Sequence, residues 1–230
     1  MDKADLIVAL DVPNAVAMEA KLRELPDFIA WYKVGLEIFC AEGPAALEPL
    51  KKRGKKIFLD LKLHDIPRTV GHAVTTAAAH GVNLMTVHAI GGRAMLEEAA
   101  KAAAVCENPP KLVAVTTLTS LGQDDFTDLG IGRTVSEQAL ALGRLAISSG
   151  IDGMVTSAHE AKVLRAEFPD ALLVVPGIRM PEGDVGDQKR VATPSFAVEQ
   201  GATHLVVGRP IVQAEDPTAA ATAMLNDMNQ

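Results

Sequence analysis

The sequence predicts an α/β fold, a closed (β/α)8 barrel of the TIM type, formed by residues 1–230 as a single domain. Three observations predict it: the chain length, the alternation of short apolar runs with longer amphipathic segments, and the number of these units. The 230 residues, 48% of them hydrophobic, suit one domain of this size with a sizeable core. No stretch rich in Pro, Gly or Ser separates two hydrophobic blocks.

Eight runs rich in Val, Ile and Leu are the expected strands. Because these runs are continuously apolar, they indicate strands buried on both faces, as in a parallel sheet. They cover residues 6–10, 29–34, 56–63, 84–88, 112–118, 153–156, 172–175 and 204–207. An open doubly wound sheet is the alternative, but it expects a Gly-rich turn after the first strand, and residues 10–13 (LDVP) contain no glycine.

Amphipathic segments between these runs are the expected helices. They cover residues 15–25, 44–53, 67–80, 94–105, 135–149, 158–167 and 217–228. Three segments begin with Pro, which the first helical turn tolerates, and Gly54, Gly81, Gly150 and Gly201 fall just past helix-like runs, where a positive φ is often needed. Residues 181–190 are polar and contain two glycines, so we expect a long loop there, followed by a short helix at 195–199.

Composition excludes several classes of partner. A net charge of −7 argues against general polyanion binding, and 3% aromatic residues argue against base stacking, so no nucleic-acid partner is expected. The two cysteines form no zinc or CxxC pattern. The N-terminus has no signal-peptide pattern and no apolar run could span a bilayer, so we expect a cytoplasmic protein without a membrane partner.

The C-terminal ends of barrel strands carry the active site in this fold, and candidate residues are found at seven of them. In chain order these candidates are Asp11, Lys33, Asp60, Lys62, Asp65, His88, Thr119, Ser120, Arg179, Gly208 and Arg209.

The third strand is the most informative. Asp60 and Lys62 are two residues apart, so both side chains should face the same side, with the intervening leucines facing the helices. Charges inside a barrel are costly unless they are paired, and a purely structural Asp60–Lys62 salt bridge is one explanation. Lys33 on the adjacent strand favours the other, a mixed-sign electrostatic site.

The last two strands predict a phosphate site. Barrels often bind phosphate with the loops after strands seven and eight, and Arg179 follows the seventh strand. Gly208 after the eighth strand would let the backbone approach a phosphate, and Arg209 supplies a guanidinium fork. Each signal is weak alone, but both occur at the expected strand ends.

Histidines allow a metal site to be considered. His64 and His88 end neighbouring strands and could share an ion. Lysines beside them repel a cation, so we expect no metal here and assign these rings to hydrogen bonding.

Residues 60–67 read DLKLHDIP, and this DxKxxD pattern with the following Ile-Pro resembles the signature of orotidine 5′-phosphate decarboxylases. Further matches occur in the family's order along the chain, and together they are most similar to the short, single-function bacterial form. They are residues 10–11 (LD), 32–35 (YKVG), 117–120 (TLTS), 176–179 (PGIR), 187–188 (DQ) and 207–211 (VGRPI).

The resemblance implies decarboxylation of orotidine 5′-monophosphate to uridine 5′-monophosphate and CO2, in pyrimidine biosynthesis, without a cofactor or metal. It implies that Lys62 donates the proton, that Asp60 lies beside the substrate carboxylate, and that Lys33 and Asp65 complete a charge array. It further implies a homodimer in which Asp65 and Thr69 reach the partner's site, with Ile66 as a further substrate-binding residue.

The remaining roles concern the substrate's three parts. The resemblance implies that Asp11 and Lys33 hold the ribose, while Thr119 and Gln188 meet the pyrimidine edge, with Ser120 as the alternative to Thr119. It also implies a phosphate grip that consists of Arg209, the Gly208 amide and Gln188, with Arg179 at the start of a loop over it.

Three other functions compete. Magnesium-dependent sugar-phosphate decarboxylases or synthases share the barrel and the DxKxxD motif, but they carry an acidic residue where this chain has Lys33. A Schiff-base aldolase would use Lys62 or Lys33 covalently. A phosphate-binding regulatory barrel would bind ligand without turnover, and the intact set of charged residues argues against it.

Overall fold

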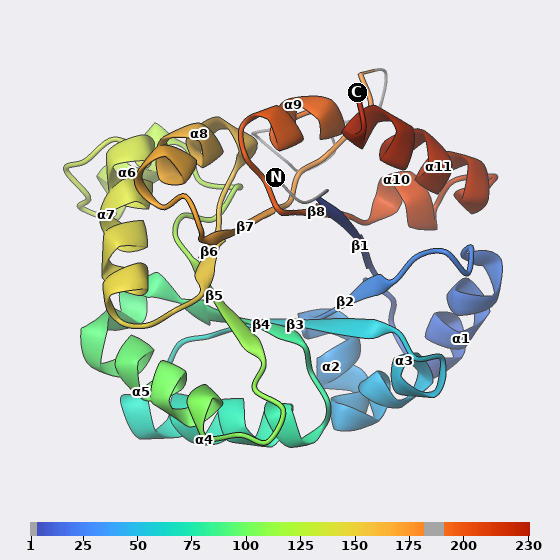
Figure 1. Cartoon of the computed structure of the whole chain (residues 1–230), viewed down its shortest axis with the longest axis horizontal. Helices are drawn as coiled ribbons and strands as arrows, with labels where there is room; N and C mark the ends of the chain where they lie inside the picture. Colours follow the sequence, from blue (N-terminus) through green and yellow to red (C-terminus); the bar gives the residue numbers. More distant parts are fainter. Residues whose placement is uncertain (1–3, 182–190) are drawn as a thin grey trace.

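The computed structural model describes residues 4–181 and 191–230, and it confirms the predicted barrel. Eight parallel strands close in the order β1-β2-β3-β4-β5-β6-β7-β8, with β8 paired to β1. The helices form a ring outside the strands, as the view down the barrel shows (Figure 1). The C-terminal ends of all strands therefore meet at one rim.

The strands agree with the apolar runs to within a few residues. They are β1 Asp5–Ala9, β2 Trp31–Gly35, β3 Lys56–Leu63, β4 Leu84–His88, β5 Lys111–Val115, β6 Gly153–Val155, β7 Leu172–Val175 and β8 His204–Val207. The largest difference is in β5, which ends at Val115 rather than at residue 118. Residues after Val115 leave the sheet and form part of the rim.

Helices follow most of the strands. They are α1 Ala15–Glu24, α2 Leu36–Glu42, α3 Glu48–Lys52, α4 Pro67–Ala79, α5 Gly92–Ala104, α6 Gln123–Asp128, α7 Val135–Ser148, α8 Ala158–Glu167, α9 Pro194–Glu199, α10 Arg209–Val212 and α11 Pro217–Met228, with 3-10 turns at Gly43–Leu47 and Ala89–Gly91. The single helix expected at 44–53 is in fact a 3-10 turn followed by α3. Among the described residues, no helix is long and apolar enough to cross a membrane.

Proline and glycine mark the helix ends as expected. Pro44, Pro67 and Pro217 each stand in the first turn of a helix. The glycines that follow helical segments have positive φ, for example +63° at Gly54 and +97° at Gly201. A side chain at those two positions would be strained, so these residues end the helices.

The core has two layers. The larger lies between the strands and the helices, and it includes Leu59, with Leu61 and Leu63 packed against it. The smaller fills the barrel interior and includes Phe58, Val174 and Val206. These three side chains also line the cavity above them, so the interior layer is the floor of the candidate site.

Candidate active site

A cavity of about 510 Å³ opens at the C-terminal rim of the barrel. Its charged or polar lining residues come from several strand ends and the loops after them: Asp11, Lys33, Glu37, Asp60, Lys62, Thr117, Thr119, Arg179, Arg209 and Gln213. Its floor is apolar and is formed by Ala9, Phe58, Val115, Val155, Val174 and Val206. Polar groups on the walls and an apolar floor are typical of a small-molecule site.

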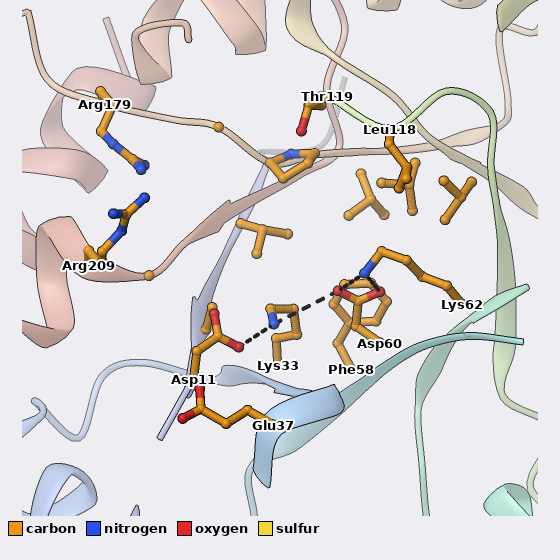
Figure 2. A pocket seen from close by; sticks show the side chains of 18 of the residues that line it. Asp11, Lys33, Glu37, Phe58, Asp60, Lys62, Leu118, Thr119, Arg179 and Arg209 are labelled. Carbon is orange, nitrogen blue, oxygen red and sulfur yellow. Dashed lines mark hydrogen bonds and ion pairs between the residues drawn. The ribbon is translucent and has the colours of Figure 1, made fainter. Parts of the chain in front are cut away.

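Four charged side chains form a row in which the sign alternates (Figure 2). The Lys33 ammonium lies 2.7 Å from Asp11 Oδ1 and 3.8 Å from Asp60 Oδ2. The Lys62 ammonium donates to both oxygens of Asp60, each at 2.9 Å. Asp60 therefore lies between two lysines, and Lys33 lies between two aspartates.

Burial makes this row more than a surface network. The side chains of Lys33 and Asp60 are only 11% and 14% exposed, and Lys62 is one-third exposed. Removing such charges from water is costly, and the opposite charges beside each group offset that cost. Because the apolar floor lowers the polarity around these groups, each charge also acts more strongly on a bound molecule than it would in bulk water.

The backbone at Lys62 is unusual. Lys62 has a φ of +50°, and it is the one non-glycine residue with positive φ in the described ranges. At the same place the pairing of β3 with β4 shifts between Leu59 and Leu63. Asp60 and Lys62 do face the same side, as predicted, but on an irregular strand end rather than a regular one. Backbone strain of this kind is found preferentially at functional sites.

Two arginines lie at the side of the cavity away from Lys62. The guanidinium groups of Arg179 and Arg209 point toward one another (Figure 2). Arg179 is buried, and its backbone bonds Ala192 across the loop after β7. Gly208 lines the cavity just before Arg209, with the Cβ of Ala9 3.4 Å from where a Gly208 side chain would begin. Two converging guanidinium groups beside an open backbone suit an anion such as phosphate.

The segment that follows β3 lies outside this cavity. Asp65, Ile66 and Thr69 are exposed at the rim, and none of them lines the cavity of its own chain. Asp65 accepts the Ile66 N–H at 2.7 Å, so it also stabilises the chain just before α4.

The pyrimidine-edge candidates separate in the structure. Thr119 lines the cavity, whereas the exposed Ser120 does not. Gln188 falls outside the described residues. Glu37, Thr117 and Gln213 line the cavity although sequence analysis did not select them. Glu37 could have been found only by recognising α2, which begins directly after β2 with no loop between them.

The two histidines considered for a metal are stacked rings with centroids 5.4 Å apart. Burial lowers the pKa of His88 below its usual value, and the neighbouring His64 and Lys62 lower it further. Within residues 4–181 and 191–230, no three His, Cys, Asp or Glu side chains gather in a way that could hold a metal ion.

Comparisons with known proteins agree with this geometry. The model of the Orotidine 5'-phosphate decarboxylase / HUMPS family matches residues 4–224. An orotidine 5'-phosphate decarboxylase of Moorella thermoacetica is 45% identical over 229 residues, covering 96% of this chain and 91% of the relative. One from Hydrogenovibrio crunogenus is 46% identical, covering 97% of this chain and 94% of the relative.

A solved structure gives the same result. The crystal structure of orotidine 5'-phosphate decarboxylase from Lactobacillus acidophilus superimposes with a TM-score of 0.87 at 38% identity, and each chain is covered completely. Identity at this level over the whole length, together with the family match, leaves one assignment. The chain belongs to the Orotidine 5'-phosphate decarboxylase / HUMPS family.

Proposed function

We propose that this protein is an orotidine 5′-phosphate decarboxylase that converts orotidine 5′-monophosphate to uridine 5′-monophosphate and CO2. The observation that carries the proposal is the alternating row Asp11, Lys33, Asp60 and Lys62 above an apolar floor. The family's sugar-phosphate branch needs an acidic residue for its metal where this chain has Lys33. This residue therefore favours the decarboxylase over a magnesium-dependent relative.

Lys62 is the proposed proton donor. When the carboxylate leaves as CO2, the electron pair of the broken C–C bond remains on the pyrimidine ring carbon, with no adjacent carbonyl to accept it. The Lys62 ammonium stabilises that charge and then transfers a proton to the same carbon. Asp60, bonded to Lys62, places a second negative charge beside the substrate carboxylate and disfavours the bound ground state.

The remaining side chains hold the substrate. Asp11 and Lys33 are placed to bind the ribose hydroxyls, and Thr119 to meet the pyrimidine edge together with Gln188. Arg209, the Gly208 amide and Gln188 are proposed to bind the phosphate, with Arg179 at the start of the loop over it. Phosphate binding far from the reacting carbon supplies energy that can be used in the transition state.

A homodimer completes the proposed site. Asp65, Ile66 and Thr69 are exposed at the rim and lie outside their own cavity, which leaves them available to a second subunit. We propose that they enter the partner's site, where Asp65 adds a second carboxylate and Thr69 reaches the ribose. Two-fold symmetry makes the exchange reciprocal.

This proposal includes a setting for the enzyme. The chain would work as a single barrel domain, in the cytoplasm, with no cofactor, in the synthesis of uridine monophosphate. No partner beyond the substrate and the second subunit is part of the proposal.

One assay tests the reaction. Purified protein is mixed with orotidine 5′-monophosphate in excess EDTA, and loss of the substrate's absorbance is followed. We expect turnover that chelation does not reduce. Activity that disappears with EDTA and returns with magnesium would instead support the sugar-phosphate branch. Inactivation by borohydride only in the presence of substrate would support a Schiff-base aldolase.

A further inference from the structure

The hydroxyl of Thr86 on β4 connects the two central charged residues from behind. The backbone N–H of Lys62 donates to Thr86 Oγ1 at 2.7 Å. The same hydroxyl lies 3.2 Å from Asp60 Oδ1. A backbone N–H can only donate and an ionised carboxylate can only accept, so the direction of both bonds is fixed. Thr86 therefore accepts from Lys62 and donates to Asp60.

These bonds form a closed circuit around Lys62. The Lys62 ammonium binds Asp60 Oδ1 at 2.9 Å, and Asp60 Oδ1 also accepts from Thr86, whose hydroxyl holds the Lys62 backbone. One hydroxyl thus controls both ends of the lysine, the backbone directly and the ammonium through Asp60. Side chains held by such networks keep one rotamer.

Thr86 is fully buried and does not line the cavity. It lies two residues after Leu84 on β4 and so faces the same side, the barrel interior, where Leu84 belongs to the interior core layer. A bound substrate would meet Asp60 and Lys62 but not Thr86. The Thr86 hydroxyl can therefore influence the reaction only through Asp60 and Lys62.

The irregular backbone explains why such a contact is needed. Four residue steps on β3, from Leu59 to Leu63, lie beside two steps on β4, from Met85 to Val87. Thr86 is the β4 residue within that shift, and Lys62 takes up the positive φ. A strained conformation persists only where its surroundings hold it, and the Thr86 hydroxyl bonds the strained residue itself.

We infer that Thr86 is a positioning residue of the decarboxylation site, which holds Asp60 and the strained Lys62 backbone so that the Lys62 ammonium faces the reacting carbon. This inference rests on the proposed function. It assigns to a buried strand residue a part in the reaction that neither the cavity lining nor the sequence motif indicates.

The test compares Thr86→Val, which keeps the shape and removes the hydroxyl, with Thr86→Ser, which keeps the hydroxyl. For Thr86→Val we expect kcat for orotidine 5′-monophosphate to fall roughly 10- to 100-fold, the size of effect that small misplacement of a catalytic group produces. KM and the affinity for uridine 5′-monophosphate should stay within about threefold, because the substrate contacts remain. Thr86→Ser should stay within about threefold of wild type in kcat.

Thr203→Val is the matched control. The Thr203 hydroxyl accepts a backbone N–H from Leu173 at 2.9 Å, at the opposite end of the barrel. This variant should lose stability without losing kcat. Thr86→Ala removes the same hydroxyl with less bulk, and it takes the place of Thr86→Val if the valine variant does not fold.

Two results would overturn the inference while leaving the proposed function intact. One is that the wild-type enzyme is active and that Thr86→Val or Thr86→Ala, each of which lacks the hydroxyl, has the same kcat. The other is a serine variant as impaired as the valine variant, which would make shape rather than the hydroxyl responsible. No turnover by the wild-type protein would overturn the proposed function first, and the role of Thr86 with it.

Discussion

The two ends of the barrel are built from the same strands but have opposite designs. At the N-terminal end, the Trp31 Nε1–H donates to Asp5 at 3.1 Å, and the Trp31 and His204 rings meet edge to face at 5.5 Å. Lys56 lies 5.1 Å above the Trp31 ring. At the C-terminal end, the same first three strands and the turn after β1 supply Asp11, Lys33, Asp60 and Lys62 around a cavity.

The difference lies in what surrounds the charges. At the N-terminal end, buried aromatic and imidazole rings fill the space, so each charge interacts with a ring or with a neighbouring charge. At the C-terminal end, charges of both signs face an open volume. Charged groups held in place around a cavity are arranged for a ligand rather than for the fold. Mutations at the C-terminal end should therefore lower activity, and mutations at the N-terminal end should lower stability.

The largest effect should come from Lys62→Ala. It removes the proposed proton donor and the charge that stabilises the carbanion, so kcat should fall at least about 1,000-fold. Binding of uridine 5′-monophosphate should persist, because the phosphate and ribose contacts remain. Steady-state kinetics and product titration measure both. A variant with near-normal kcat would remove Lys62 from the mechanism.

The second effect is recovery of activity in a mixture. Lys62→Ala and Asp65→Ala are each expected to be nearly inactive, and their subunits are allowed to exchange. If Asp65 acts across the interface, each hybrid dimer has one site with both lesions and one with neither. Random pairing makes half of the dimers hybrid, so about a quarter of all sites should regain wild-type activity.

The alternative outcome of the mixing experiment is equally clear. If Asp65 serves only its own chain, for example through its bond to the Ile66 N–H, every site in the hybrid still carries one lesion. Activity would then stay at the level of the separate variants, and the shared-site proposal would be wrong.

A smaller effect is expected from Arg209→Ala. Loss of one charged phosphate contact should raise the activation free energy by about 1.5–3 kcal/mol, which lowers kcat/KM roughly 10- to 150-fold. The kcat/KM for a truncated nucleoside substrate without phosphate should change little in the same variant. Arg23→Ala, an exposed arginine on α1, is the matched control and should leave both substrates unaffected. Equal losses on both substrates would mean that Arg209 supports the fold.

The comparison of the two ends also explains what the sequence could predict. All eight strands were predicted, and β3, β4, β7 and β8 were predicted with their observed ends, because continuous apolar runs bounded by Pro and Gly are local signals. The charged row could be placed because strand ends of a parallel barrel share one rim. The contact between Lys62 and Thr86 joins residues 24 positions apart through a register shift, which leaves no local pattern.

Three short helices were missed for a related reason, whereas the short α9 was predicted at 195–199. The helices α2, α6 and α10 contain seven, six and four residues, which is too few for a clear helical period. α2 positions Glu37 at the cavity and α10 begins at Arg209, so the omission affected the rim more than the core. Loop lengths and rim helices vary independently of the strands in this fold.

The smallest expected effect is at the N-terminal end, at His204. Burial lowers the pKa of His204, and Lys56 lowers it further, while Asp5 acts in the opposite direction. The folded protein therefore binds a proton at His204 less readily than the unfolded chain does. Stability should be fully present above about pH 6.5, the ordinary histidine value, and should fall as the pH drops below it.

His204→Gln should reduce this pH dependence without changing kcat at pH 8. Urea unfolding between pH 8 and pH 5, at fixed protein concentration, measures it. His88 has a lowered pKa as well, so part of the dependence should remain. His72→Gln, an exposed position on α4, is the control. If His204→Gln showed the wild-type pH dependence, the buried ring would not be the source of the acid sensitivity.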